Sequence, residues 1–182
     1  MHKKLTAFLF DAVSTCVSAV VVIAVIFSLG FRLTTVEGSS MEPTLSDRDK
    51  LIVRSAAGEY TYGDIVIVAE PNILNEIIVK RVIATEGQWV DVRYDEGIVY
   101  VGDTLDTLQP LDEPYTASLT DEFNPEDEHA YPVQVPAASV FVMGDNRNHS
   151  TDSRSYRVGF INENYILGKV YVRLAPELET YF

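Results

Sequence analysis

Two residues of this chain have the types and surroundings that serine-based hydrolysis requires. Ser40 lies in the segment SSMEPTL (residues 39–45), and Lys80 lies in the apolar segment IIVKRVI (residues 77–83). A serine hydroxyl becomes a nucleophile only when a base removes its proton. A lysine enclosed by apolar side chains holds its own proton less tightly, so it can serve as that base. The pair therefore predicts a serine–lysine hydrolase.

The expected burial of Lys80 has an energetic cost, which argues for a use. Lowering the pKa of a lysine from about 10.4 to about 8 by desolvation costs on the order of 3 kcal/mol. Proteins seldom keep such a cost at a position without a function. The alternative is that Lys80 lies at a sheet edge and extends its amine into water.

The residues around Ser40 favour a constrained turn. Gly38 permits unusual backbone dihedrals upstream, and Pro43 fixes the backbone downstream. Such a turn can expose the Ser40 hydroxyl and align the Ser40 backbone N–H toward the oxyanion of a tetrahedral intermediate. An ordinary capped turn is the alternative for this segment taken alone.

A third segment, GDNRNHSTDSR (residues 144–154), follows a strand-like run and alternates aspartate with arginine. This alternation predicts charges paired at fixed positions, in a loop able to hold a buried base. His149 precedes Ser150 directly, and neighbouring side chains on an extended segment point apart. A Ser–His pair is therefore not expected here.

The elements that must position these residues begin with a hydrophobic N-terminal segment. Residues 12–31 contain no formal charge, and 20 helical residues span about 30 Å, the thickness of a bilayer core. Lys3 and Lys4 precede the segment and favour a cytoplasmic N-terminus. We therefore expect residues 1–11 inside, a transmembrane helix over 12–31 and an extracytoplasmic domain over 32–182. A cleaved secretory signal peptide is the alternative, since Ser28 and Gly30 supply small residues.

Beyond the anchor the chain reads as a mainly β domain. Short runs of branched and aromatic residues are separated by turn signals, and no long amphipathic helix is apparent. The strands expected on this basis are 33–37, 50–54, 64–69, 77–85, 89–93, 98–101, 139–143 and 169–174. Residues 103–128 are acidic and contain three prolines, which indicates an excursion from the main sheet.

Composition excludes several other classes of function. The net charge of −13 argues against binding to nucleic acid. The lone cysteine, Cys16, lies in the apolar segment, so no disulfide is expected in the outer domain. The three histidines are scattered and no cysteine–histidine spacing suits zinc, so we expect no metal and no cofactor.

Taken together, the segments resemble the diagnostic motifs of bacterial type I signal peptidase. Residues 40–45 resemble its nucleophile box, residues 80–84 its base box and residues 144–154 its last box, while residues 63–66 match a further strand motif. The order of the motifs and the single anchor resemble the compact members of that family. The resemblance implies a mainly β extracytoplasmic catalytic domain, with a reduced inserted β subdomain at about 94–130, preceded by one transmembrane helix.

The resemblance implies a role for each matching residue. Ser40 would be the nucleophile, Lys80 the general base, and Ser150 would bind and orient the Lys80 amine. Four further residues would form a supporting charge network whose pairings the sequence does not assign: Arg81, Asp145, Asp152 and Arg154. Four apolar residues would form pockets for small substrate side chains: Val36, Met41, Leu45 and Val79.

The chain departs from the family pattern at some positions. Some members carry a serine hydroxyl two residues before the nucleophile, where this chain has Gly38. The oxyanion hole would then depend on backbone N–H groups alone. Four residues also separate Arg154 from Gly159, more than in the shortest form of the last box.

The resemblance implies removal of signal peptides from exported preproteins after a small-x-small motif. The expected partners are preprotein signal peptides and the lipid bilayer, with the secretion translocon as a possible neighbour. A self-cleaving repressor shares a β-rich Ser–Lys domain, but it requires a DNA-binding unit where this chain has an apolar segment. A membrane-tethered β domain that only binds a partner leaves Lys80 and residues 144–154 unexplained.

Overall fold

A computed structural model describes residues 2–28, 30–55, 58–69, 76–121, 130–174 and 179–180. The chain separates into two compact units, Met1–Arg32 and Leu33–Phe182. Residues 122–129, which belong to the predicted acidic excursion, lie outside the described residues.

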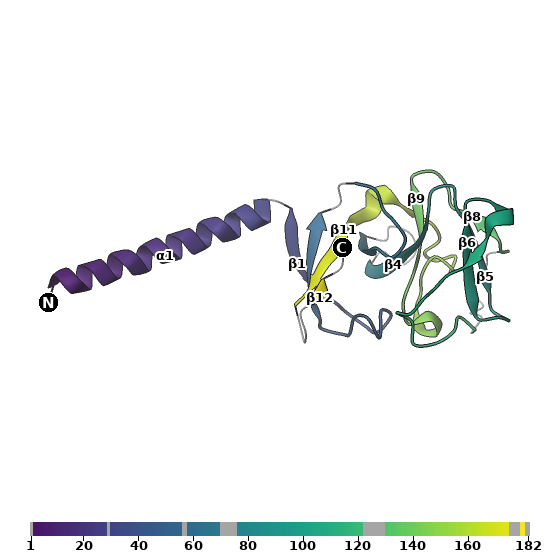
Figure 1. Cartoon of the computed structure of the whole chain (residues 1–182), viewed down its shortest axis with the longest axis horizontal. Helices are drawn as coiled ribbons and strands as arrows, with labels where there is room; N and C mark the ends of the chain where they lie inside the picture. The colour runs from purple at the N-terminus through teal and green to yellow at the C-terminus, as the bar shows by residue number, and fades with distance from the viewer. Residues whose placement is uncertain are drawn as a thin grey trace. The chain divides into compact units, whose positions relative to one another are not determined.

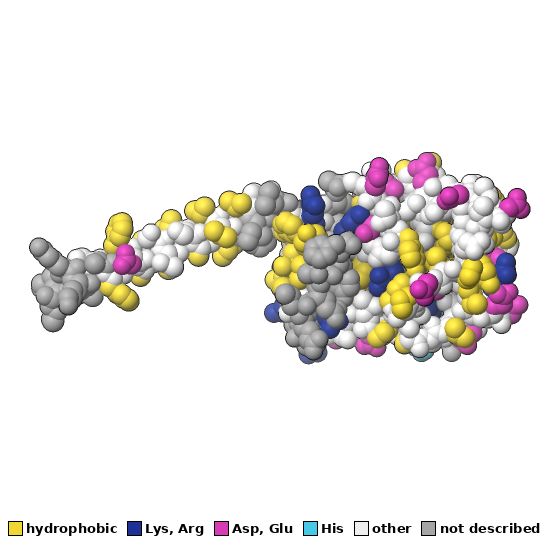
Figure 2. All heavy atoms as spheres, in the orientation of Figure 1, with side chains coloured by type: hydrophobic (Ala, Val, Ile, Leu, Met, Phe, Trp, Pro, Cys, Tyr) yellow, Lys and Arg dark blue, Asp and Glu magenta, His cyan; other side chains and the backbone are white. Residues whose placement is uncertain are grey.

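The first unit consists mainly of one helix, α1 (His2–Ser28). Within it, residues Phe8–Val25 are long and apolar enough to cross a membrane, and none of this stretch is buried in the protein. Figure 2 shows hydrophobic side chains along the described part of the helix. The helix starts before and ends before the predicted transmembrane helix over 12–31, whose limits in a membrane stay a prediction. The positive φ of Gly30, 82°, is incompatible with a continuing helix, and Phe31 begins a strand.

The second unit is built on a large antiparallel sheet with the strand order β1-β2-β11-β3-β4-β9-β10, with β12 pairing with β11 (Figure 1). Its strands are β1 (Phe31–Thr35), β2 (Lys50–Ser55), β3 (Ile65–Ala69), β4 (Ile77–Thr85), β9 (Ser139–Met143), β10 (Ile161–Asn162), β11 (Ile166–Arg173) and β12 (Glu179–Thr180). The short 3₁₀ helices are η1 (Leu105–Thr107), η2 (Arg147–His149) and η3 (Glu163–Tyr165).

A smaller sheet has the order β7-β6-β5-β8. Its strands are β5 (Trp89–Arg93), β6 (Ile98–Gly102), β7 (Gln109–Pro110) and β8 (Val133–Gln134). The excursion therefore begins at β5 and closes at β8, so the predicted limits of 94–130 were too narrow. The reason is that β5 pairs with β6 and with β8, which makes it part of the inserted sheet.

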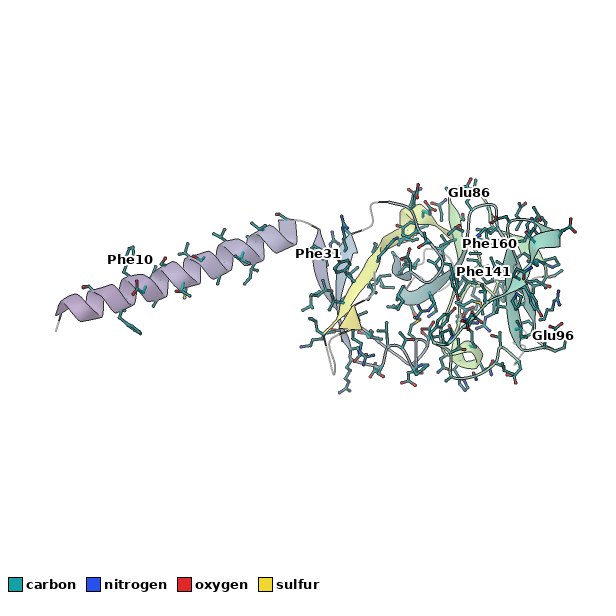
Figure 3. All side chains as sticks on the ribbon, in the orientation of Figure 1. Phe10, Phe31, Glu86, Glu96, Phe141 and Phe160 are labelled. Carbon is teal, nitrogen blue, oxygen red and sulfur yellow. The ribbon has the colours of Figure 1, made fainter. Side chains whose placement is uncertain are left out.

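The two sheets share a hydrophobic core. Ile83 and Phe141 of the large sheet pack in one cluster with Val90 and Val99 of the small sheet. Phe141 meets Phe160 edge to face at a ring separation of 5.9 Å, and Figure 3 shows the two side chains lying beside each other. The predicted mainly β class is confirmed. All eight predicted strands are present, some with ends shifted by a few residues, whereas the two-residue strands β7, β8, β10 and β12 were not predicted.

Acidic side chains lie on the visible face of this unit, in accord with the excess of Asp and Glu in the sequence. Figure 2 shows Asp and Glu side chains spread over its visible face. The buried charges, in contrast, gather around the segments that carry Lys80 and residues 144–154.

Candidate active site

The structure brings Ser40 and Lys80 together. Ser40 lies in the turn that follows β1, and Lys80 lies on β4. Lys80 Nζ is 2.8 Å from Ser40 Oγ, within hydrogen-bond distance, and also donates to the Val79 carbonyl oxygen at 3.0 Å. A proton on the serine hydroxyl can therefore pass to a neutral amine without any change of geometry.

Strand pairing explains why Lys80 is buried. On β3, Val66 is the register partner of Lys80, and Val66 is fully buried. Only 3% of the Lys80 surface is exposed. Burial lowers the pKa of Lys80 to about 8, the Asp152 and Asp145 carboxylates oppose this shift, and the Arg154 charge adds to it. Hence the alternative of a lysine extended into water does not describe this side chain.

The turn that carries Ser40 is held at both ends by hydrogen bonds. Gly38 has a φ of 88°, a conformation that favours glycine, and its N–H donates to Asp47 Oδ1 at 2.9 Å. On the other side, the Asn146 N–H donates to the Ser40 carbonyl oxygen and Asn146 Nδ2 donates to that of Ser39, both at 3.1 Å. The loop of residues 144–154 thus contacts the backbone of the serine turn directly.

The four residues of the predicted charge network form two separate buried pairs, which the sequence alone did not assign. Arg81 binds Asp145 through both Nε and Nη2, at 2.8 and 2.6 Å. Arg154 Nε donates to Asp152 Oδ1 at 2.8 Å, and Asp152 Oδ2 accepts the Gly144 N–H at 2.9 Å. Burial by itself raises the pKa of Asp152, but the charge and hydrogen bonds of Arg154 hold it below its usual value.

Ser150 differs from its expected arrangement. Its Oγ is buried and has no hydrogen-bond partner among the described residues, so the expected bond to the Lys80 amine is not formed in this structure. Gly144 lies so close that a Cβ added to it would overlap Ser150 Oγ. The hydroxyl therefore lies against the backbone of the loop, and a role in orienting Lys80 stays a prediction.

A cleft of about 520 Å³ opens beside the Ser40–Lys80 pair. Three of the four predicted substrate-binding residues line it, namely Val36, Met41 and Val79. Leu45 is completely buried and packs in the same hydrophobic cluster, behind the cleft wall. The cleft thus has apolar residues in its lining, with Ser40 and Lys80 at the same cleft.

Sequence reasoning gave no role to four residues that surround this site. Asn146 and Arg147 lie inside the segment 144–154, so membership of that segment was the available signal. Glu113 and Tyr115 lie in the excursion and reach the segment through long-range contacts with Arg147. No local pattern in the sequence could have identified these two.

Comparison with known proteins identifies the family. The model of the signal peptidase family, peptidase S26, matches residues 9–175. A probable signal peptidase I-1 of Synechocystis sp. is 34% identical over 169 residues, which cover 85% of this chain and 79% of the relative. A signal peptidase I of Bacillus licheniformis is 34% identical over 174 residues, which cover 88% of this chain and 85% of the relative.

A solved structure gives a weaker likeness. The crystal structure of a signal peptidase I from Enterococcus faecalis V583 has a TM-score of 0.45 and 25% identity, over 63% of this chain and 98% of that chain. The match to the family model over most of the chain, and the two relatives, confirm the family predicted from the motifs. This chain therefore belongs to the signal peptidase family of serine endopeptidases, peptidase S26.

Proposed function

We propose that this protein is a membrane-anchored serine endopeptidase that removes signal peptides from exported preproteins, with Ser40 as nucleophile and Lys80 as general base. The observation that carries the proposal is the 2.8 Å separation of Ser40 Oγ from a buried Lys80 Nζ in a chain of the signal peptidase family. A lysine pKa of about 8 leaves roughly one amine in ten neutral at pH 7, enough for a base.

The reaction would proceed by acyl transfer. Neutral Lys80 accepts the Ser40 proton while Ser40 Oγ attacks the scissile carbonyl carbon. The resulting ammonium donates this proton to the leaving amine as the peptide bond breaks. Lys80 then takes a proton from water as the water oxygen attacks the acyl carbon. The ester to Ser40 Oγ breaks as the Lys80 ammonium returns this proton to Ser40 Oγ, which leaves Lys80 neutral again.

The oxyanion would be stabilised by the backbone of the serine turn. Among the described residues, none accepts a hydrogen bond from the Ser40 N–H, so this donor is available. Gly38 offers no side-chain hydroxyl beside it. Because Asn146 holds the carbonyl oxygens of Ser39 and Ser40, the peptide planes that carry the donor are fixed before substrate binds.

The substrate would bind as an extended strand between two open edges of the sheet. β1 is a terminal strand of the large sheet, and Thr34–Val36 line the cleft. β9 pairs with β4 only from Arg81 onward, so the edge of residues 77–80 that faces away from β3 has no partner strand in the described part of the chain. Backbone pairing would supply affinity, and pockets lined by Val36, Met41 and Val79 would favour small side chains.

The helix α1 would anchor the enzyme in the bilayer. With Lys3 and Lys4 at its start, the N-terminus would lie in the cytoplasm and the β domain outside it. The anchor would then hold the active site near the membrane surface and near the translocon, where signal peptides end.

The test is cleavage of a synthetic peptide carrying Ala-x-Ala before the cut, using the full chain in detergent and mass spectrometry to locate the cut. We expect cleavage after the second alanine by the wild type, and a loss of about 10³-fold or more in kcat for Ser40→Ala and Lys80→Met. The matched controls are Ser118→Ala and Lys50→Met, which alter exposed residues and should keep wild-type rates. Wild-type rates in folded Ser40→Ala or Lys80→Met would refute the proposed pair.

A further inference from the structure

The acidic excursion reaches back to the loop that surrounds Lys80. Glu113, in the excursion, accepts two hydrogen bonds from the Arg147 guanidinium, each 2.6 Å long. Arg147 is 1% exposed, although it belongs to the loop of residues 144–154. Arg147 Nη1 also donates to Thr120 Oγ1 at 3.3 Å, and Asn148 Nδ2 donates to Asp121 Oδ1 at 2.8 Å. An arginine removed so completely from water needs a paired carboxylate, and the excursion supplies it.

Tyr115 joins the two arginines of this region. The Arg81 guanidinium carbon lies 3.9 Å from the centre of the Tyr115 ring, and that of Arg147 lies 5.7 Å from it. The Tyr115 hydroxyl donates to Glu113 Oε1 at 3.0 Å and is 3.1 Å from the Tyr62 hydroxyl. The excursion thus contacts Arg81, the residue next to Lys80, as well as the loop.

From Arg147 the contacts continue to the residues around the amine. Arg147 Nε donates to the Gly144 carbonyl oxygen at 3.1 Å, and the Arg147 carbonyl oxygen accepts from Arg154 Nη2 at 2.6 Å. Arg154 holds Asp152, and Asp152 accepts the Gly144 N–H. The charged groups that act on the Lys80 amine are Asp152, Arg154 and Asp145, all in this loop.

None of the excursion residues in these contacts lines the cleft. They act on the reaction through the loop and through Arg81, so an effect on substrate binding is not expected. We infer that Glu113 and Tyr115 are positioning residues, which clamp Arg147 and Arg81 so that the loop of residues 144–154 keeps the Lys80 amine enclosed and aligned with Ser40. The inference rests on the proposed roles of Ser40 and Lys80, and it assigns a function to the excursion.

The direct test measures the Lys80 amine and requires no turnover. The chain has five lysines, so ¹³Cε-lysine labelling gives few signals, and Lys80→Met assigns the one of interest. In Glu113→Gln the loop should loosen and admit water, and we expect the Lys80 pKa to rise from about 8 by about one pH unit. An unchanged Lys80 pKa in folded Glu113→Gln would overturn the inference.

A second variant separates positioning from general stability. Glu113→Leu combined with Arg147→Met removes both charges, so neither is left buried without a partner, and the thermal midpoint should stay near that of the wild type. We still expect kcat on the Ala-x-Ala peptide to fall about tenfold or more, with KM within about twofold, because the loop is no longer held. Wild-type kcat and wild-type Lys80 pKa in this double variant would show that the pair serves stability alone.

The chain offers a matched control in the exposed pair of Arg93 and Glu96, on the hairpin of β5 and β6, at 3.1 Å. Glu96→Gln removes an Arg–Glu interaction from the same inserted sheet, and it should leave both the Lys80 pKa and kcat unchanged. Absence of cleavage by the wild type itself would refute the proposed function, whereas the NMR comparison would still decide the role of Glu113.

Discussion

Lys80 and Ser40 are 40 residues apart in the chain, yet Lys80 Nζ and Ser40 Oγ lie 2.8 Å from each other. The sheet makes this possible, because β4 places the Lys80 amine within hydrogen-bond distance of the serine in the turn that follows β1. The loop after β9 contacts the same turn, since the Asn146 N–H donates to the Ser40 carbonyl oxygen. Three segments distant in sequence therefore define one site, and each has a testable effect on it.

The pH dependence of kcat/KM should report the Lys80 amine. Only the neutral amine accepts the serine proton, and burial lowers the Lys80 pKa to about 8. We therefore expect kcat/KM to rise about tenfold per pH unit below pH 8 and to level off above it. Peptide cleavage measured from pH 6 to 10, with circular dichroism to monitor folding, gives the profile. A rise that continues to pH 10 would contradict a lowered lysine pKa.

Replacement of Lys80 should stabilise the folded protein. Below pH 8 the lysine is protonated in both the folded and unfolded states, and the folded state bears the full cost of a buried charge. A pKa of about 8 against a usual 10.5 corresponds to about 3 kcal/mol. Asp145 and Asp152 keep their arginine partners without Lys80. We expect Lys80→Met to raise the free energy of unfolding at pH 7 by up to about 3 kcal/mol.

The same linkage fixes how that difference changes with pH. Between pH 8 and 10.5 the unfolded wild type binds more protons than the folded one, so wild-type stability rises with pH. The advantage of Lys80→Met should therefore shrink over this interval in denaturant titrations. Lys50→Met, which alters an exposed lysine, should show no such change. A difference that is constant from pH 7 to 10.5 would exclude burial of the charged amine as the cause.

The fold could be predicted largely from local patterns, because strands of branched residues between turn signals are a local property. The limits of the inserted sheet and of the helix were harder to predict. β5 resembles any other amphipathic strand, and only its pairing with β6 and β8 assigns it to the inserted sheet. The C-terminal end of the helix was also not predicted. The apolar run continues through Phe31, whereas the helix ends at Ser28, before the positive φ of Gly30.

The site was predictable to the extent that its residues lie in ordered motifs. Lys80 could be recognised because a lysine in an apolar strand is expected to be buried, and burial of its charge is unfavourable, which indicates a function. Which aspartate pairs with which arginine depends on the path of the loop. The Arg81–Asp145 and Arg154–Asp152 pairs could therefore be assigned only from the structure. Glu113 could not be recognised, because a glutamate in an acidic segment looks like any solvated charge until its Arg147 partner is located.

Gly144 should be required for the geometry of the pair. A Cβ at this position would overlap both Ser150 Oγ and the Ser40 carbonyl oxygen. Gly144→Ala must displace the loop or the serine turn, and a displacement of about 1 Å costs about 100-fold in kcat. Gly87→Ala is the control, because nothing lies within 4 Å of a Cβ added there, although the positive φ of Gly87, 82°, makes the substitution strained. It should lower stability by about 1 kcal/mol and keep kcat. A Gly144→Ala enzyme within twofold of wild-type kcat would show that the turn tolerates the shift.

Val79 should set the size of the side chain accepted before the cut. It lines the cleft beside Lys80, is only partly buried, and packs against the cluster that contains Val36 and Met41. Val79→Ala removes two methyl groups and deepens the pocket, so kcat/KM for an Ala-x-Val peptide should rise about tenfold relative to Ala-x-Ala. Ile98→Ala, which shortens a half-buried residue of the inserted sheet, should leave that ratio unchanged. Because the ratio compares two substrates on one enzyme, a general loss of stability cancels. A ratio equal to that of the wild type would place the specificity pocket elsewhere in the cleft.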